Sequence, residues 1–319
     1  MNRMWNNLVF PLINELKPNY IVEVGAERGS NTLSMLEYCV KNDGHLTCID
    51  PFPLFDVESY KEKYGEKFEM IEDLSLNVLD SLKGYDLILL DGDHNWYTIY
   101  NELKSIERNF NQYNFPFIIF HDVSWPYARR DIYYNPDNIP KEFLNPYEKK
   151  GIYPGENKLR EEGGLNSSIY NATEENTPKN GVLTGIEDFI NESDFNLTFK
   201  TLNAFHGLGL MYISNSETDR IIHDIIWNSN ITGVMDEYYL KKTIDMLDNF
   251  NKTRIENDHK ISNLKNELSQ KDQEILNLKI ENKKLKSRNW KLNKKQTEIL
   301  SSNSWKITKP LRTFKSKLF

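Results

Sequence analysis

Short apolar runs alternate with amphipathic segments along the first 120 or so residues of the chain. Runs of β-branched and other apolar residues predict strands at 20–24, 45–50, 68–71, 85–90 and 117–121. Between them, apolar residues recur at helical spacing and predict helices at 2–16, 31–40, 57–64, 76–82 and 96–109. This alternation is typical of an α/β fold with a doubly wound parallel sheet.

The alternation stops after residue 122 and returns near residue 181. The segment between, about 125–180, is rich in Tyr, Pro, Gly, Arg and Asn and has no sustained period. A long aperiodic segment is either a functional insertion or a disordered loop, and the many aromatic residues favour an ordered insertion that binds substrate. A helix at 181–191 and strands at 195–202 and 208–213 are expected to complete the sheet.

A heptad pattern runs through residues 254–300. Its a positions are Ile261, Leu268, Ile275, Asn282, Asn289 and Gln296, and its d positions are Leu264, Lys271, Leu278, Leu285, Leu292 and Ile299. Aligned heptads that carry asparagine at the first position, a, favour a parallel two-stranded coiled coil and hence a homodimer. The alternative is a single charged helix folded back on the body. We therefore expect a catalytic domain at 1–250, a coiled coil at 251–300 and a basic amphipathic tail at 301–319.

The net charge of −7 hides a strong asymmetry. Residues 251–319 hold 18 Lys+Arg and 7 Asp+Glu, whereas residues 1–250 hold 22 and 40. The acidic body argues against nucleic acid as a substrate, and the basic tail is expected to contact an anionic membrane surface. Since no apolar run is long enough to span a bilayer and the first residues lack the pattern of a signal peptide, we expect a cytoplasmic protein, peripheral at the inner membrane face.

Polar residues at the ends of two predicted strands carry the candidate chemistry. Asp91-Gly92-Asp93-His94 follows the strand at 85–90, and His121-Asp122 closes the strand at 117–121. The carboxyl ends of parallel strands share one edge of a sheet, where open α/β folds bind ligands. Acids and histidines brought together there supply a hard-cation site and a proton acceptor, which indicates metal-assisted chemistry on an oxygen.

A glycine-containing turn follows the first predicted strand. Gly25 and Gly29 let the backbone turn tightly and approach a ligand, and the following helix offers free N–H groups. Asp50, at the end of the second strand, is placed to accept hydrogen bonds from both hydroxyls of a ribose. The dinucleotide fingerprint is absent because Glu27 occupies the position of its second glycine, so a nucleoside without a pyrophosphate fits better. The alternative is that the glycines serve only packing.

The order acid-x-Gly-x-x-x-Gly, then an acid closing the next strand, resembles the S-adenosylmethionine site of class I methyltransferases. With the Asp91 and His121 strand ends, the resemblance spans about residues 20–213. It implies a Rossmann-like methyltransferase sheet and S-adenosylmethionine as the cofactor. The cofactor-binding candidates that it implies are Glu23, Gly25, Glu27, Gly29, Asn31, Asp50 and Asp73.

Within that superfamily the chain is similar to bacterial methyltransferases of the macrocin O-methyltransferase type, and more distantly to catechol O-methyltransferase. This likeness implies that Asp91, His121 and Asp122 hold Mg²⁺. It also implies that His94 is the general base. His121 departs from the family pattern, because Mg²⁺ prefers oxygen ligands.

The insertion and the tail resemble segments of methyltransferases associated with bacterial surface-glycan glycosyltransferases, at 125–134, 163–166, 180–184 and 304–312. The resemblance implies a saccharide or glycoconjugate acceptor, for which the candidate contacts are Trp125, Arg129, Arg130 and Tyr133. The two arginines are expected to clamp an acidic group of the acceptor. The alternative is that they form ion pairs with Asp131 or Asp137.

Together these features predict an S-adenosylmethionine-dependent, metal-assisted O-methyltransferase that acts on a sugar hydroxyl. Two alternatives stay open. One is a metal-free enzyme in which His94 is the base and Asp122 orients it. The other is a catalytically inactive, methyltransferase-like scaffold in a glycan-assembly complex.

Overall fold

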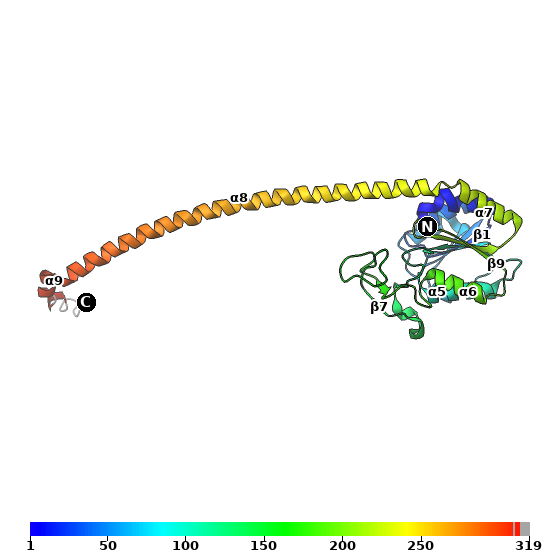
Figure 1. Ribbon diagram of the computed structural model, residues 1–319, viewed down its shortest axis with the longest axis horizontal. Helices are drawn as coiled ribbons and strands as arrows, with labels where there is room; N and C mark the ends of the chain where they lie inside the picture. Colours follow the sequence, from blue (N-terminus) through cyan, green and yellow to red (C-terminus); the bar gives the residue numbers. More distant parts are fainter. Residues whose placement is uncertain (309, 313–319) are drawn as a thin grey trace. The chain divides into compact units, whose positions relative to one another are not determined.

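A computed structural model describes residues 1–308 and 310–312, and the chain divides into two units, Met1–Tyr238 and Tyr239–Phe319. The first unit is built on a seven-stranded sheet (Figure 1). Its strand order is β3 (Phe68–Ile71), β2 (His45–Ile49), β1 (Tyr20–Val24), β4 (Leu87–Leu90), β5 (Phe117–His121), β10 (Leu208–Ile213) and β9 (Leu197–Leu202). The pairs from β3 to β5 are parallel, and β10 is antiparallel to both of its neighbours. The predicted doubly wound α/β fold is confirmed.

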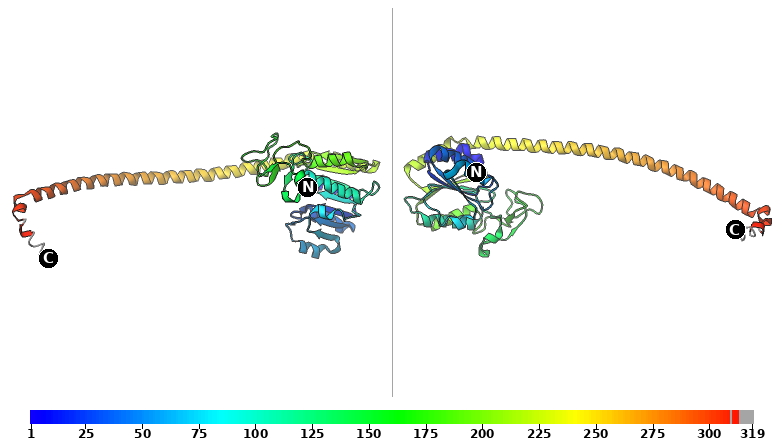
Figure 2. Two further views of the ribbon diagram at one scale, coloured as in Figure 1. Left: turned by 90° about the horizontal axis from the view of Figure 1, so that it is seen from below. Right: turned by 180° about the vertical axis from the view of Figure 1, so that it is seen from behind.

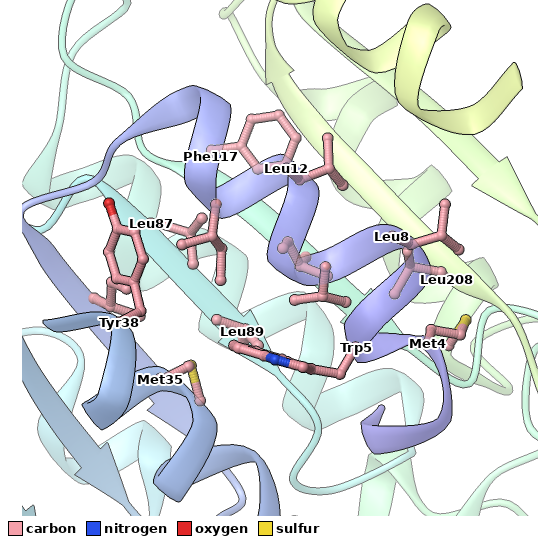
Figure 3. Close-up of a cluster of buried hydrophobic side chains, with 14 of the residues drawn as sticks. Met4, Trp5, Leu8, Leu12, Met35, Tyr38, Leu87, Leu89, Phe117 and Leu208 are labelled. Atoms are coloured by element: carbon pink, nitrogen blue, oxygen red, sulfur yellow. The ribbon is translucent and has the colours of Figure 1, made fainter. Parts of the chain in front are cut away.

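Helices cover both faces of the sheet because successive strand residues point to opposite sides (Figure 2). In β4, Leu87 and Leu89 join one hydrophobic cluster, whereas Ile88 and Leu90 join another. The first cluster also holds side chains from α1 (Phe10–Leu16), α2 (Ser30–Asn42) and α7 (Ser216–Asn228); Figure 3 shows part of it. The second holds side chains from α5 (Trp96–Asn109) and α6 (Val182–Glu192). Burial on both faces is why these strands are continuously apolar.

The amino-terminal segment is helical as predicted, but it takes three forms. These are the 3-10 helix η1 (Asn2–Met4), the π-helix η2 (Trp5–Val9) and then α1. Pro11 lacks the N–H that would bond the carbonyl of Asn7, and the change from π to α geometry comes just before it.

Shorter helices connect the strands on the β3 side of the sheet. They are α3 (Val57–Tyr64), η3 (Gly65–Lys67) and α4 (Ser75–Val78). The helix predicted at 76–82 ends early, at Val78. The side-chain amide of Asn109 donates to the carbonyl oxygens of Leu79 and Leu82, which satisfies the backbone of this stretch without a longer helix.

The insertion after β5 is ordered, as predicted. It contains a small antiparallel sheet of β6 (Ile132–Tyr133), β8 (Tyr170–Ala172) and β7 (Tyr147–Glu148), together with η4 (Pro136–Asn138) and η5 (Lys141–Phe143). Asp131 ties it to the main body, because its Oδ1 accepts hydrogen bonds from the N–H groups of Trp96 (2.7 Å) and Gly181 (2.6 Å). These two residues stand at the starts of α5 and α6, so the insertion is held by two helices of the domain.

The second unit is largely helical. The helix α8 (Ile231–Ser301) contains the predicted 254–300 and begins earlier, with Ile231 and Tyr238 packed in the first unit; α9 (Asn303–Ile307) follows. The boundary between the units therefore falls at Tyr238 rather than near residue 250.

The helix α7 was not predicted, although Asn215 caps it. No helix among the described residues is long and apolar enough to span a membrane. In the predicted tail, residues 309 and 313–319 lie outside the described residues.

Candidate active site

The register of the sheet brings the carboxyl ends of β1, β4 and β5 to one level. Val24 pairs with Leu90, and Leu90 pairs with Phe120. The residues that follow these strands therefore meet at one edge of the sheet. A cavity of about 870 Å³ opens at this edge, which is within the size range of sites for cofactor-sized ligands.

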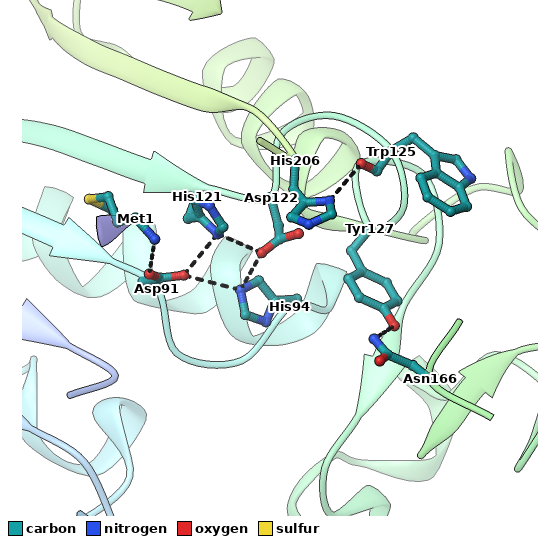
Figure 4. A network of polar contacts seen from close by, with 9 residues as sticks. All are labelled: Met1, Asp91, His94, His121, Asp122, Trp125, Tyr127, Asn166 and His206. Atoms are coloured by element: carbon teal, nitrogen blue, oxygen red, sulfur yellow. Dashed lines mark hydrogen bonds and ion pairs between the residues drawn. The ribbon is translucent and has the colours of Figure 1, made fainter. Parts of the chain in front are cut away.

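Four side chains form a compact cluster on the wall of this cavity: Asp91, His94, His121 and Asp122 (Figure 4). One ligand atom from each lies within 4.8 Å of the other three. Nε2 of His94 lies 2.9 Å from Oδ2 of Asp122, and Nδ1 of His121 lies 2.7 Å from the same oxygen. Nδ1 of His121 also lies 3.1 Å from Oδ1 of Asp91. The structure thus brings the three predicted metal ligands and the predicted base together.

Burial and mutual charge act in opposite directions on the pKa values of this cluster. Burial raises the carboxyl pKa values of Asp91 and Asp122, but the adjacent imidazoles more than offset it and hold both below the usual range; for Asp91 the ammonium of Met1, 3.2 Å from its Oδ2, adds to this effect. Burial lowers the imidazole pKa values of His94 and His121, and the carboxylates raise both above the usual range. The four groups therefore stabilise one another as opposite charges.

The imidazole of His94 is buried and incompletely satisfied. Although its Nε2 lies close to Asp122, neither ring nitrogen makes a hydrogen bond of good geometry to the described residues, because the carboxylate oxygen lies off the N–H direction. Buried polar atoms ordinarily have partners, so this ring is available to a ligand. Asn95 caps α5, accepting a hydrogen bond from the N–H of Thr98 at 2.8 Å. The cap of this helix is therefore Asn95 and not His94.

The donor set of the cluster fits a divalent metal ion. Two carboxylates and two imidazoles converge, and the ring nitrogens of His94 make no well-aligned hydrogen bond to the described residues. A set of carboxylates that includes imidazole nitrogen suits Zn²⁺, Mn²⁺ or Fe²⁺, whereas Mg²⁺ prefers oxygen ligands alone.

The turn after β1 lies beside the cluster. Gly25 has a φ of +88°, and a Cβ there would collide with the backbone of Asp91 and Gly92. Asp50 holds the same turn, because its Oδ2 accepts hydrogen bonds from the N–H groups of Ala26 (2.9 Å) and Glu27 (2.8 Å). Its Oδ1 accepts one from Phe52 (2.8 Å). A carboxylate has about four acceptor positions, so Asp50 retains capacity for a ligand hydroxyl.

The predicted cofactor residues divide into two groups. Gly25, Glu27, Asn31 and Asp50 line the cavity, whereas Glu23, Gly29 and Asp73 do not. Glu23 is buried beneath the turn, accepts hydrogen bonds from Thr32 (2.5 Å) and Cys48 (3.1 Å), and has its pKa raised by burial to about 7.

Gly29 and Asp73, like Glu23, make contacts with neighbouring parts of the fold. The ring of Phe55 covers the position of a Cβ at Gly29. The carboxylate of Asp73 accepts hydrogen bonds from the N–H of Leu74 and the amide of Asn77. Glu23, Gly29 and Asp73 therefore lie outside the cavity lining, and direct contact of these residues with the cofactor stays a prediction.

The four residues predicted to bind the acceptor do not line the cavity. The guanidinium of Arg129 forms a two-pronged ion pair with Glu187 (2.6 and 2.7 Å), so ion pairing is observed, with a partner other than the two expected. Arg130 is fully buried and donates to the carbonyl oxygens of Ala172 and Asn157. Both arginines therefore stabilise the insertion.

The two aromatic candidates, Tyr133 and Trp125, also lie outside the cavity lining. Tyr133 is buried, and its hydroxyl donates to Oδ2 of Asp131 at 2.7 Å. The carbonyl oxygen of Trp125 lies 3.4 Å from Nδ1 of His206, and the indole lies outside the cavity lining. Tyr133 is thus engaged inside the insertion, whereas acceptor binding by Trp125 stays a prediction, because its contact with His206 is through the backbone and its indole is partly exposed.

Other residues that the sequence did not single out for the site line the cavity. They include Met1–Met4, Phe52, Tyr134, Asn135, Asn138 and His206. The sequence gives a partial indication of Tyr134. Neighbouring side chains of an extended segment point to opposite sides, so only one of Tyr133 and Tyr134 can face the cavity. The sequence alone does not say which.

Residues 22–123 match the family model described as a methyltransferase domain. The matched segment runs from β1 to just beyond Asp122 and so contains the Gly25 turn, Asp50 and the four-residue cluster. Together with the strand order, the match defines the class: the chain carries a class I methyltransferase domain, and the protein is an S-adenosylmethionine-dependent methyltransferase.

Solved structures offer distant likenesses. One is the S-adenosylhomocysteine-bound methyltransferase PaMTH1 of Podospora anserina, with 17% identity over 65% of this chain and 77% of that chain and a TM-score of 0.40. Another is 1,6-didemethyltoxoflavin-N1-methyltransferase of Burkholderia thailandensis, with 13% identity over 66% and 76% and a TM-score of 0.37. A comparison with curated proteins found no match. The assignment rests on the family match and the strand order.

Proposed function

We propose that this protein is a metal-assisted O-methyltransferase that transfers a methyl group from S-adenosylmethionine to a sugar hydroxyl of a bacterial glycan or glycoconjugate. The observation that carries the proposal is the four-residue cluster, which lines the same cavity as Gly25 and Asp50. A cofactor bound against the Gly25 turn is thereby placed beside acid, base and metal-binding groups.

Asp50 and the turn after β1 are assigned to the cofactor, which supplies the methyl group when bound. The carboxylate of Asp50, which already accepts three backbone hydrogen bonds, has room for one more from a ribose hydroxyl, and the absence of a side chain at Gly25 allows close approach to the backbone. Most of the rate of an in-line methyl transfer comes from such positioning.

Asp91, His121 and Asp122 are assigned to a divalent ion, whose contribution when bound is Lewis-acid stabilisation of an alkoxide. Because imidazole nitrogen is part of this set, we assign the site to a transition-metal ion such as Mn²⁺ or Zn²⁺ in preference to the Mg²⁺ that the macrocin-type resemblance implies. The three residues come from the ends of two adjacent strands, so the sheet holds them in place.

His94 is assigned the role of general base. Against the effect of burial, the neighbouring carboxylates raise the pKa of its imidazole, and a divalent cation held by those carboxylates would offset their charge and free the imidazole to accept a proton. A sugar hydroxyl is a poor nucleophile because its pKa is far above neutrality, so its proton must leave as the new bond to carbon forms. The imidazole of His94 lies within the cluster and is free of good hydrogen bonds to the described residues, and Asp122 lies 2.9 Å from its Nε2. The likeness of the insertion to segments of glycan-associated methyltransferases supports a saccharide as the acceptor.

Calorimetry with two ligands tests the proposal. We expect the protein to bind S-adenosylhomocysteine, and separately to bind Mn²⁺ with an affinity that falls at least tenfold in Asp91→Asn and in Asp122→Asn. The matched control is Asp43→Asn, an exposed aspartate paired with Lys67. Equal Mn²⁺ and Zn²⁺ affinity in all variants refutes the metal assignment and favours the metal-free mechanism. Failure to bind S-adenosylhomocysteine refutes the enzyme and favours the scaffold.

A further inference from the structure

The insertion presents one aromatic side chain to the cavity, next to the cluster. Tyr134 follows β6 and is 56% exposed, whereas its neighbour Tyr133 is buried. The ring centroid of Tyr134 lies 6.3 Å from that of His94, with the two planes at 67°. A ligand lying on the ring of Tyr134 is therefore within reach of the proposed base.

Polar groups stand on either side of this ring. Asn135 and Asn138 flank η4 and line the cavity, and the amide of Asn135 donates to Oδ1 of Asn138 at 3.2 Å. This leaves the Nδ2 group of Asn138 available to a ligand. From the other side His206, in the turn between β9 and β10, lies with its ring 6.3 Å from that of His121. An aromatic face bordered by amides and an imidazole suits a ligand with one apolar face and many hydroxyls.

We propose that Tyr134, Asn138 and His206 form the acceptor subsite, with a pyranose ring packed on Tyr134 and its hydroxyls bonded to Asn138 and His206. The inference rests on the proposed function and specifies where its acceptor binds. Arg129 and Arg130 are engaged within the insertion and do not line the cavity. Arg3 and Arg28 do line it, with Arg28 beside Glu27 and Arg3 over the ring of Phe205.

Saturation-transfer NMR tests the subsite, with the full-length protein loaded with S-adenosylhomocysteine and a panel of methyl pyranosides. We expect saturation of at least one neutral pyranoside and about tenfold weaker binding in Tyr134→Ala. The ring-retaining Tyr134→Phe should keep most of the binding, and Tyr113→Ala, which removes an exposed tyrosine outside the cavity lining, should keep all of it. No saturation of any pyranoside, or equal binding by Tyr134→Ala, overturns the subsite. Binding of S-adenosylhomocysteine, measured separately, shows whether the cofactor assignment stands.

An independent feature lies in α8. Its apolar a and d side chains are all exposed along the helix. They are Ile261, Leu264, Leu268, Ile275, Leu278, Leu285, Leu292 and Ile299. A stripe with this seven-residue spacing is the seam of a coiled coil and buries its surface against a second helix of the same kind.

The charged positions beside the seam distinguish the two possible orientations. In a parallel in-register pair, Glu274 faces Lys279 of the second copy and Glu281 faces Lys286. In an antiparallel pair centred on the same heptads, Glu274 faces Glu281 and Lys279 faces Lys286, which repel. In the heptads closer to Lys260, the parallel pair also has two contacts between like charges. The preference for the parallel orientation therefore comes from the central heptads.

The asparagine residues at the a positions of the heptads add to this preference. Asn282 and Asn289 each meet their own copy across a parallel in-register seam, where the two amides bond each other. We infer that residues 261–299 pair with the same segment of a second copy as a parallel, in-register dimer. The charged positions thus give independent support to the parallel orientation that the heptads predict.

Sedimentation and cysteine crosslinking of the full-length protein test this dimer. We expect a mass of twice 37.6 kDa and a monomer in Leu278→Asp/Leu285→Asp. Oxidation should link Asn289→Cys into a covalent dimer, because a parallel register places the two residues together. Ser287→Cys, on the outer face of the same turn, is the control and should link poorly. A monomeric or trimeric wild type overturns the dimer, and equal linking of the two cysteine variants overturns the register.

Discussion

Glu102 is a buried acid on α5 whose charge state couples the stability of the domain to pH. It is 1% exposed, and its Oε1 accepts a hydrogen bond from the hydroxyl of Ser75 at 2.5 Å. Burial, with a further contribution from nearby Asp93, raises the pKa of Glu102 from 4.5 to about 8. Replacement by glutamine keeps the shape and an acceptor for Ser75 but removes the titration.

The sign and size of the effect follow from this shift. Because the folded-state pKa is raised, the stability associated with Glu102 is fully present below pH 4.5 and is lost as the pH rises toward about 8. One pKa unit corresponds to about 1.4 kcal/mol. Between pH 5 and pH 8 the acid should therefore lower the free energy of unfolding by about 3 kcal/mol. Glu102→Gln should not show this loss.

Urea unfolding followed by tryptophan fluorescence at pH 5, 6.5 and 8 measures the difference. We expect the stability advantage of Glu102→Gln over the wild type to grow by about 3 kcal/mol from pH 5 to pH 8. The control is Glu37→Gln, which removes an exposed glutamate on α2 and should run parallel to the wild type. Parallel curves for Glu102→Gln and the wild type would refute the reasoning.

Four further outcomes are expected. Asp50→Ala should weaken S-adenosylhomocysteine binding by about 1 to 3 kcal/mol in calorimetry, since charge-assisted hydrogen bonds are lost. Gly25→Ala should abolish that binding and lower the melting temperature, because its Cβ collides with the backbone after β4; Gly84→Ala, at positive φ in open space, should cost only backbone strain. His94→Ala should lower kcat by roughly 10² to 10⁴ while sparing cofactor binding. Removal of residues 251–319 should abolish co-sedimentation with anionic liposomes at low salt, if the basic tail is the membrane contact.

Strand and helix positions within the sheet were largely accessible from the sequence. The apolar runs of β1 and β4 and the amphipathic pattern of α5 reflect burial that is local in the chain, so their bounds agree with the structure to within a few residues. For the same reason the cluster of Asp91, His121 and Asp122 was predictable, since parallel strands end at a common edge. The helix α4 departs from its prediction because a distant side chain, Asn109, binds the carbonyl oxygens of that stretch.

The acceptor side of the cavity was decided by tertiary structure alone. Whether an arginine such as Arg129 faces a ligand or an internal partner depends on what the fold places opposite it, and here that is Glu187, 58 positions along the chain. Likewise Tyr133 and Tyr134 have the same chemistry, and only the packing of β6 around Asp131 buries one and exposes the other. The sequence by itself determined the sheet and the chemistry at its edge, because these follow from local periodicity. The lining contributed by the insertion and the amino-terminal helix follows from contacts between distant segments, which no local pattern encodes.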